Sequence, residues 1–548
     1  MPREYYNDFP EFYTIREIIL DGAERGKDKR QFIFINRNGE EEEKSFREVY
    51  EDECALGAYL RSKGVTKNQK IALLSENCYE WNMIFYTIAV SGSVCIPLDT
   101  GLSKEEIEKQ LANSGCEVIF CTRKQRDKVD FACENSEVRL SSIFMVEDCD
   151  KYIEEGRKLD KAYLDAYLSA EVSPEDLACI VYTSGTTGRT KGVMLSNKNI
   201  CSDVNASLHA VTGGHGIGFL PLNHTYAWVT GLFATLLRSE WGYICTNLRH
   251  LYDDIKKYEP YEFASVPLAV EMIYKNIVVT AKRNGSYDKI LTGINTSRNF
   301  LLSGFDARRD IFAEIHEKFG GNLEYILCGG AYLAPEIEEF MNDIGIQIIT
   351  GYGLTECSPT VTCSRRYEYK VGSVGLPLEC CQISIHEPDE NGIGEIYVKG
   401  DNVMMGYYND EEATKAAFDG EWFKTGDYGY IDNEGYLFFT GRKKNLIILS
   451  NGKNVSPEEI EAELMSSIDY VKEVVVYEEN KRICAEFFLD ETKEKNARDL
   501  LSGDVDKVNT KLADFKRVQT VKIRDEEFPK TTTMKIKRNA IKTPATVG

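Results

Sequence analysis

Short hydrophobic runs alternate with amphipathic stretches along most of the chain. Residues 70–75, 93–98 and 116–121 have the length and the flanking turn residues of buried strands, whereas residues 104–113 have the pattern of an amphipathic helix. Strands that alternate with helices in this way are typical of proteins with largely parallel sheets. The pattern therefore predicts the α/β class.

The same alternation continues through the middle of the chain. Residues 177–182 form an apolar run that ends in a loop at residues 183–192, and Ser196 is placed to cap a helix beginning near Asn197. Residues 323–327 predict another strand, and Pro335 suits the first turn of the helix that follows. A glycine-rich loop between a buried strand and a capped helix is a candidate ligand-binding element.

The C-terminal part repeats the pattern on a smaller scale. Residues 458–465 look helical, and residues 473–477 and 483–489 look like strands. A boundary near residues 441–444 fits this change of scale. We expect an N-terminal domain of residues 1–441 and a C-terminal domain of residues 442–548.

Composition limits the possible functions. The chain has 548 residues, 43% of them hydrophobic, which suits two or more domains. Its 66 basic and 88 acidic residues give a net charge of −22, which argues against nucleic acid held by a broad basic surface. A local positive site for polyphosphate remains compatible with this charge.

Targeting and metal-binding signals are weak. The N-terminus lacks a signal-peptide pattern, and the apolar residues 83–98 are interrupted by Ser91 and Gly92 and are short for a transmembrane segment. They read better as a helix followed by a buried strand. The 16 cysteines include no CxxC pair and are expected to be mostly buried thiols in a reducing, cytoplasmic environment.

The loop at residues 183–192, TSGTTGRTKG, has the composition of a phosphate-binding element. It contains three glycines, five hydroxyl residues and two cations. Glycines let backbone N–H groups approach phosphate oxygens, hydroxyls donate further hydrogen bonds, and Lys191 supplies a compensating charge. The spacing is not that of a Walker A loop, which disfavours a kinase or motor ATPase. A flexible turn is the alternative on composition alone.

The order of these residues carries more information than their composition. YTSGTTGRTKGV at residues 182–193 closely resembles the signature loop of the adenylate-forming superfamily, which includes acyl-CoA synthetases, peptide-synthetase adenylation domains and beetle luciferases. The resemblance extends from about residue 46 to residue 541. It implies a catalytic role for Lys191 and a large N-terminal domain with a small mobile α+β C-terminal domain. The implied ATP-binding residues of the loop are Thr183, Ser184, Gly185, Thr186, Thr187 and Gly188.

Two further segments resemble the family's adenine and phosphate motifs. The turn of Gly329, Gly330 and Ala331 is similar to the adenine-side turn, although an ordinary strand-to-helix turn has the same composition. GYGLTE at residues 351–356 is similar to the second ATP signature. The implied roles are adenine stacking by Tyr352, α-phosphate contact by Thr355 and Mg²⁺ ligation by Glu356, and Gly353 belongs to the implied ATP-binding set.

The ribose and hinge motifs follow in the family's order. WFKTGD at residues 422–427 places Asp427 where the family binds the ribose hydroxyls; alone, such an Asp is equally typical of a turn. GRKK at residues 441–444 resembles the inter-domain hinge. It implies that Arg442 contacts the ribose side and that Lys444 is the pivot.

PKTTTMKIKR at residues 529–538 resembles the C-terminal catalytic loop and implies that Lys535 is catalytic. The sequence departs from the family at Met534, where glycine is usual. If that position needs a positive φ, Met costs about 1–2 kcal/mol. The departure leaves Lys530 and Lys537 open as alternatives to Lys535 as the catalytic lysine. Without the resemblance, the segment would be interpreted as a solvated basic tail.

LPLNH at residues 220–224 resembles the segment whose histidine lines the acyl pocket, so His224 is implied to act there. From the residues alone, a packed histidine is the commoner case. Residues 225–228 lack the aspartate with which peptide-synthetase domains pair an amino group. A buried ammonium without a counter-charge is costly, which weakens the amino-acid reading.

Together the motifs imply an ATP-dependent ligase that activates a carboxylate, with a fatty acid favoured, and transfers it to coenzyme A, with Mg²⁺ as cofactor. An enzyme that loads an amino, aryl or fatty acid onto an acyl carrier protein is the main alternative. A luciferase-type oxygenase lacks positive support. A catalytically silent nucleotide-binding protein has Met534 as its best support.

Overall fold

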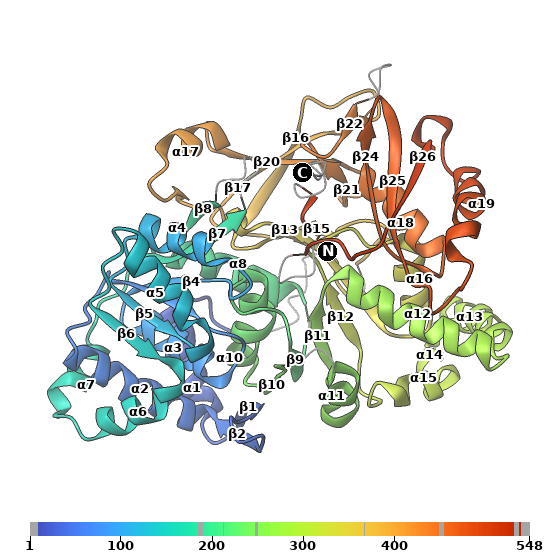
Figure 1. The fold of residues 1–548 in the computed structure, drawn as a ribbon. Helices are drawn as coiled ribbons and strands as arrows, with labels where there is room; N and C mark the ends of the chain where they lie inside the picture. The colour runs from blue at the N-terminus through green and yellow to red at the C-terminus, as the bar shows by residue number, and fades with distance from the viewer. Residues whose placement is uncertain are drawn as a thin grey trace.

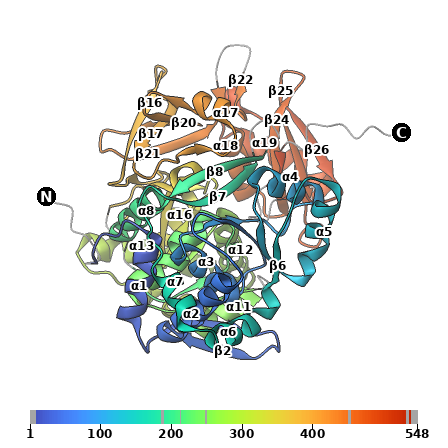
Figure 2. The same ribbon diagram turned by 90° about the vertical axis from the view of Figure 1, so that its left-hand side faces the viewer.

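The computed structural model describes most of the chain. The described residues are 9–184, 190–211, 213–246, 250–366, 368–448, 454–530 and 536–538, with side chains at 184, 448 and 454 excepted. Figure 1 shows the N-terminal strands and helices in two bodies side by side, with the C-terminal elements above them. Figure 2 shows the same C-terminal elements on top from a perpendicular direction.

A seven-stranded sheet forms the left-hand body of Figure 1. Strands β3 to β7 pair in parallel, while β8 is antiparallel to both β7 and β18. In spatial order the strands are β18 (Gly406–Tyr407), β8 (Thr190–Ser196), β7 (Leu177–Ser184), β4 (Val94–Pro97), β3 (Lys70–Leu74), β5 (Val118–Cys121) and β6 (Ser142–Met145).

Helices cover both faces of this sheet. They are α1 (Ile15–Gly26), α2 (Phe46–Ser62), α3 (Tyr79–Val90), α4 (Lys104–Ser114), α5 (Arg126–Asn135), α6 (Cys149–Arg157), α7 (Lys161–Leu168) and α8 (Asn197–Ala210). Successive residues of β3 point to opposite faces: Ile71 and Leu73 share a core with α2 and α3, whereas Ala72 and Leu74 pack in another with α4 and α5. Burial on both faces explains why the strands read as continuous apolar runs.

A nine-stranded sheet lies beside the first. Its middle strands are parallel, and antiparallel strands complete both edges. In spatial order they are β15 (Leu376–Pro377), β14 (Thr360–Cys363), β13 (Gln347–Gly353), β12 (Tyr325–Cys328), β11 (Glu262–Ser265), β9 (Gly216–Gly218), β10 (Gly242–Ile244), β1 (Arg30–Ile35) and β2 (Glu41–Ser45).

The helices associated with this sheet include a π-helical segment. They are α9 (Thr225–Ala227), η3 (Trp228–Phe233, π-helical), α10 (Ala234–Arg238), α11 (Leu251–Tyr258), α12 (Pro267–Arg283), α13 (Tyr287–Leu302), α14 (Arg308–Ile311), α15 (Ala313–Lys318) and α16 (Pro335–Asp343).

Antiparallel strands dominate the C-terminal third. One sheet holds β16 (Cys381–His386), β17 (Gly394–Gly400), β19 (Phe418–Asp419), β20 (Trp422–Ile431) and β21 (Leu437–Arg442), followed in the chain by the pair β22 (Ile447–Ile448) and β23 (Asn454–Val455). A last sheet holds β24 (Val471–Glu479), β25 (Arg482–Leu489) and β26 (Thr520–Arg524). The helices are α17 (Glu411–Ala417), α18 (Pro457–Ser467) and α19 (Ala497–Asn509).

The C-terminal elements have a hydrophobic core of their own. Buried residues between Ile447 and Val518 form one cluster, which joins α18, α19 and the last sheet. The fold is therefore α/β with a large multi-sheet N-terminal part and a smaller α+β C-terminal part, as predicted. Among the described residues, no helix combines the length and hydrophobicity needed to cross a bilayer.

Several local predictions are confirmed. The strands expected at residues 70–75, 93–98 and 116–121 are β3, β4 and β5, and residues 83–98 form the end of α3 and then β4. Ser196 caps α8 through a capping box with Asn199, and Pro335 is the first residue of α16. All 16 cysteines are free thiols, and none of them is exposed.

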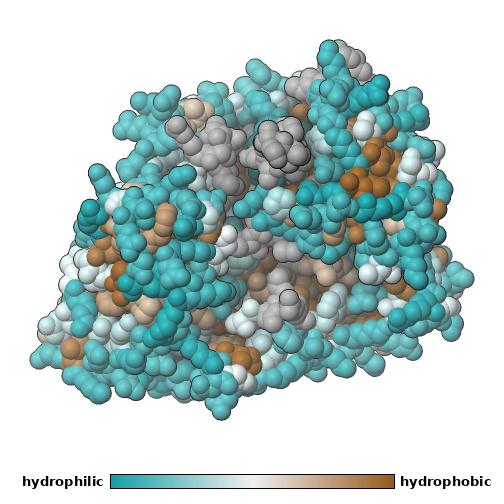
Figure 3. Space-filling view, in the orientation of Figure 1, coloured by the Kyte–Doolittle hydropathy of each residue, from teal (hydrophilic) through white to brown (hydrophobic). Residues whose placement is uncertain are grey.

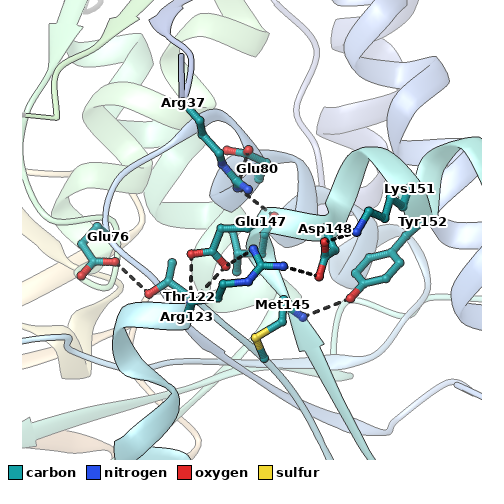
Figure 4. Close-up of polar contacts among 11 residues, drawn as sticks. Arg37, Glu76, Glu80, Thr122, Arg123, Met145, Glu147, Asp148, Lys151 and Tyr152 are labelled. Atoms are coloured by element: carbon teal, nitrogen blue, oxygen red, sulfur yellow. Dashed lines mark hydrogen bonds and ion pairs between the residues drawn. The ribbon is translucent and has the colours of Figure 1, made fainter. Parts of the chain in front are cut away.

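The carboxyl edge of β3, β5 and β6 is filled by the chain's own charged side chains (Figure 4). Ligands of open α/β sheets commonly bind at such edges. Here Thr122 donates to Glu76 (3.0 Å), the Arg123 guanidinium donates to Asp148 (2.8 Å), and the Arg123 backbone N–H donates to Glu147 (2.9 Å). The hydrogen-bonding groups in this part of the edge thus pair with one another.

Candidate functional site

The two ends of the glycine-rich segment are paired antiparallel strands. Thr183 pairs with Lys191 and Ser184 with Thr190, so β7 and β8 continue into what the sequence predicted to be a loop at residues 183–192. That prediction is wrong for residues 183, 184 and 190–192, because backbone pairing across the hairpin extends both strands. The predicted phosphate-binding residues Gly185, Thr186, Thr187 and Gly188 lie outside the described residues.

Tyr407 joins Lys191 to Glu356. Strand β18 pairs with β8, and this brings the Tyr407 ring 4.4 Å from the Lys191 Nζ. The Tyr407 hydroxyl donates to Glu356 Oε1 at 3.0 Å. Burial raises the pKa of Glu356, and the hydrogen bond from Tyr407 opposes that rise. Tyr407 thus contacts a cation through its ring and a half-buried carboxylate through its hydroxyl.

Residues of the GYGLTE motif follow one another through the end of β13 and a short turn. Tyr352 and Gly353 end the strand, and Thr355 and Glu356 lie in the 3-10 turn η5 (Thr355–Cys357). A Cβ at Gly353 would lie 2.0 Å from the carbonyl oxygen of Pro359, so this position requires glycine. The Met404 N–H donates to the Glu356 carbonyl at 2.9 Å and holds the turn.

Asp427 is buried between two partners. The Tyr352 hydroxyl donates to its Oδ2 at 2.9 Å, and the Arg442 Nε lies 3.2 Å from its Oδ1. Asp427 and Arg442 face each other across β20 and β21, so backbone pairing sets this contact. Burial and the neighbouring Asp427 raise the pKa of Tyr352. The predicted ribose and adenine residues are therefore in direct contact.

The glycine turn after β12 lies next to the segment that carries His224. A Cβ at Gly329 would lie 3.5 Å from the Tyr226 ring and 3.6 Å from the Gly351 carbonyl oxygen, and Gly330 has a φ of +87°. The Tyr226 hydroxyl donates to the carbonyl of Leu327 at 3.0 Å, which ties α9 to the end of β12. Half-buried His224 immediately precedes α9, and Ala331 follows the turn.

The predicted hinge begins at Arg442, which contacts Asp427. Lys444 follows β21, and burial and the charge of Arg442 lower its pKa. Lys535, the predicted catalytic lysine, lies outside the described residues. Of the two alternatives, Lys530 forms ion pairs with Glu473 and with Glu527.

The structure therefore connects predicted residues from widely separated motifs. Glu356, Asp427 and Arg442 are close enough for their charges to interact, and Tyr407 contacts both Glu356 and Lys191. Sequence reasoning missed Tyr407, because a Gly-Tyr pair in a polar segment carries no distinctive pattern. It also missed Tyr226, whose contact with β12 depends on the packing of α9.

The surface around these parts is mostly hydrophilic (Figure 3). Hydrophobic residues gather in a few places on this face, among them the hollow between its left-hand and right-hand halves. In the described part of the chain, no group of three or more His, Cys, Asp or Glu side chains is arranged to hold a metal ion by itself.

Comparison with known families gives two matches. Residues 20–408 match the family model described as AMP-binding enzyme, and residues 444–544 match the model described as AMP-binding enzyme C-terminal domain.

Comparison with individual proteins gives relatives at low to moderate identity. A long-chain-fatty-acid–CoA ligase, FadD15, of Mycobacterium bovis is 30% identical over 434 residues, covering 75% of this chain and 71% of the relative. A long-chain-fatty-acid–CoA ligase of Salmonella typhimurium is 26% identical over 498 residues, covering 83% and 81%.

Solved structures share the fold. The anthranilate CoA ligase AuaEII in complex with anthranoyl-AMP superposes with a TM-score of 0.79 at 19% identity, covering 97% of each chain. The o-succinylbenzoate CoA synthetase MenE of Bacillus subtilis with its acyl-adenylate intermediate gives a TM-score of 0.74 at 24% identity, covering 96% of this chain and 98% of that chain.

Proposed function

This chain belongs to the AMP-binding enzyme family, and from that premise we propose that it is an AMP-forming acyl-CoA synthetase acting on a fatty acid. The observation that supports this most directly is the contact of Tyr352 and Arg442 with Asp427, together with the link of Lys191 to Glu356 through Tyr407. The names of the relatives support a fatty acid and coenzyme A as the substrates.

We assign roles to residues according to the family resemblance and their positions. Catalytic roles go to Lys191, His224 and Lys535. The ATP and AMP site comprises Thr183, Ser184, Gly185, Thr186, Thr187, Gly188, Gly329, Gly330, Ala331, Tyr352, Gly353, Thr355, Glu356, Asp427 and Arg442.

Glu356 fits a magnesium site. It is a half-buried carboxylate in the turn η5 that follows β13, a hard oxygen donor of the kind that Mg²⁺ takes together with phosphate oxygens. When bound, Mg²⁺ would reduce the repulsion between the anionic acid and the triphosphate. Tyr407 holds the Glu356 side chain in place for this role through its hydroxyl.

The chemistry is a problem of charge rather than of proton transfer. The substrate carboxylate is already ionised at neutral pH, so its oxygen can attack the α-phosphorus while the bond to pyrophosphate breaks. Lys191 and Lys535 would offset the negative charge that develops on the phosphate oxygens, a contribution of about 3 kcal/mol for one such group. In the second step the thiol sulfur of coenzyme A attacks the acyl carbon and AMP leaves.

We also propose that residues 1–441 and 442–548 are the two domains, with the hinge at residues 442–444 and Lys444 as the pivot. The separate hydrophobic core between Ile447 and Val518 supports this division. The contact of Arg442 with Asp427 would then connect the hinge to the nucleotide. We further propose that the protein is cytoplasmic. An acyl carrier protein is the alternative acceptor of the acyl group.

The test is to incubate the protein with ATP, Mg²⁺ and a panel of carboxylic acids, with and without coenzyme A, and to identify the products. AMP together with acyl-CoA is the expected result. ADP in place of AMP would overturn the adenylation chemistry. Acid-dependent AMP without a coenzyme A product would favour transfer to a carrier protein.

A further inference from the structure

The loop between β3 and α3 contacts the segment that carries His224. Asn77 in this loop donates through Nδ2 to the carbonyl of Leu220 at 2.8 Å, and its Oδ1 accepts from the Leu222 N–H at 3.0 Å. The residue between them is Pro221, which has no N–H of its own. One side-chain amide thus pairs with the backbone on both sides of this proline, as a peptide group of a neighbouring strand would.

These two hydrogen bonds join different parts of the fold. Asn77 follows β3 of the seven-stranded sheet, whereas Leu220 and Leu222 follow β9 of the nine-stranded sheet. The carbonyl of Leu222 accepts from the Nε1 of buried Trp228 at 2.7 Å. Both backbone polar groups of Leu222 are therefore held, the N–H by Asn77 and the carbonyl by Trp228.

His224 lies two residues beyond Leu222 and belongs to the same turn. Its N–H donates to the carbonyl of Pro221 at 3.1 Å, and its own carbonyl accepts from the Ala227 N–H at 3.1 Å. The position of the His224 backbone therefore depends on where Pro221 and Leu222 lie. A misplacement of about 1 Å can lower a reaction rate about 100-fold, so the contacts that hold this turn matter for any role of His224 toward a substrate.

The loop that carries Asn77 is itself tied down through the preceding residue, Glu76. Glu76 accepts from the Thr122 hydroxyl at 3.0 Å (Figure 4). It also accepts from the Nε2 of buried Gln125 at 2.8 Å. Both donors follow β5, which pairs with β3 in the sheet. The side-chain amide of Asn77 is therefore presented by a loop whose conformation is set by the fold, so little ordering is needed when a substrate binds.

The same pair of hydrogen bonds occurs in the C-terminal part of the chain. Asn509 Nδ2 of α19 donates to the carbonyl of Val518 at 3.0 Å, and the Val518 N–H donates to Asn509 Oδ1 at 2.8 Å. Asn509 is half-buried, as Asn77 is. None of the residues proposed for the nucleotide or acyl site lies between residues 509 and 518. Asn509 therefore measures what such a pair of hydrogen bonds contributes to folding.

We propose that Asn77 is a positioning residue for the acid substrate: by holding Leu222 it sets the position of His224 in the acyl pocket. This inference rests on the proposed function, because it takes His224 as an acyl-pocket residue. It adds a residue that lies outside the nucleotide motifs and comes from the other large sheet. The role requires no contact between Asn77 and the acid.

The first test compares the acid with ATP in the variant Asn77→Ala. Two hydrogen bonds between uncharged groups correspond to about a 10- to 100-fold change in an equilibrium constant. We expect kcat/KM for the acid in acyl-CoA formation to fall by about that factor, while the KM for ATP stays unchanged. An unchanged kcat/KM for the acid, or a comparable rise in the KM for ATP, would overturn the inference.

A double variant tests whether Asn77 acts through His224. If it does, Asn77→Ala should lower kcat/KM for the acid much less in a His224→Ala background than in the parent, because the group to be positioned is already gone. Losses that simply multiply would contradict the proposed role. If Asn77→Ala does not fold, Asn77→Asp carries the same comparison, since it keeps the acceptor for the Leu222 N–H and removes only the donor to Leu220.

Asn509→Ala is the matched control. It removes the same two kinds of hydrogen bond, so we expect a fall in melting temperature similar to that of Asn77→Ala, with no loss of kcat/KM for the acid. A loss for the acid as large as that of Asn77→Ala would attribute the effect to folding and count against the inference.

The outcomes separate this inference from the proposed function. If the parent forms AMP and acyl-CoA but Asn77→Ala keeps its kcat/KM for the acid, only the inference fails. If the parent forms no AMP with any acid, the proposed function fails and the inference falls with it.

Discussion

The hydroxyl group of Tyr352 offers a sharp test of the nucleotide site. It donates to Asp427 Oδ2 at 2.9 Å, and Asp427 also pairs with Arg442 at 3.2 Å. The substitution Tyr352→Phe removes the donor and keeps the ring that is proposed to stack on adenine. Asp427 then retains its contact with Arg442 but loses the hydrogen bond from Tyr352, which holds its carboxylate in the orientation proposed for ribose binding.

The size of the effect follows from the burial of the acceptor. A hydrogen bond to a charged group contributes about 1.5–3 kcal/mol, and each 1.4 kcal/mol corresponds to about a tenfold change. Because Arg442 remains in place, we expect the lower end of this range, about a tenfold rise in the KM for ATP. A ribose contact is made equally in the ground state and in the transition state, so kcat should change little.

Initial rates of acyl-CoA formation at varied ATP measure both constants. The matched control is Tyr430→Phe, which changes a tyrosine on β20, the strand that carries Asp427; Tyr430 stacks on Phe438 with ring centroids 4.9 Å apart. ATP analogues that lack one ribose hydroxyl sharpen the test, because the variant should discriminate against them less than the parent does. An unchanged KM for ATP, or a fall in kcat alone, would refute the reasoning.

Three further predictions concern other parts of the site. Tyr407→Phe removes the donor to Glu356 and should raise the Mg²⁺ concentration needed for half-maximal ATP–pyrophosphate exchange about tenfold, whereas Tyr408→Phe should not. Lys535→Ala should slow adenylate formation in single-turnover assays and leave ATP binding largely intact; equal adenylation rates would remove Lys535 from catalysis. Burial raises the pKa of Glu461 from 4.5 to about 7 against the opposing charge of Arg538. Because the pKa of Glu461 is higher in the folded than in the unfolded state, stability is lost as pH rises from 4.5 to about 7. In Arg538→Met the pKa should rise further, so this loss should continue above pH 7. Parallel curves of melting temperature against pH for parent and variant would contradict this prediction.

Local patterns predicted the elements that depend on neighbouring residues. The capping serine Ser196 and the first-turn proline Pro335 satisfy or tolerate the free backbone groups of their own helices, so their effect can be read without the rest of the fold. The buried strand β3 was predicted for a similar reason, since burial on both faces leaves a continuous apolar run. Strand β7 was predicted two residues too short and β8 was not predicted, because pairing between strands is invisible to the composition of either one.

The sequence by itself determined the α/β class and, through the order of its motifs, the family and its adenylation chemistry. Some motif residues are recognisable because they depend on a fixed local shape, such as the close approach of the Pro359 carbonyl at Gly353. Only the tertiary structure showed that Tyr407 contacts both Lys191 and Glu356 and that Tyr352 and Arg442 both contact Asp427. Such contacts join residues far apart in the chain, and they arise from strand pairing and helix packing, which no local pattern encodes.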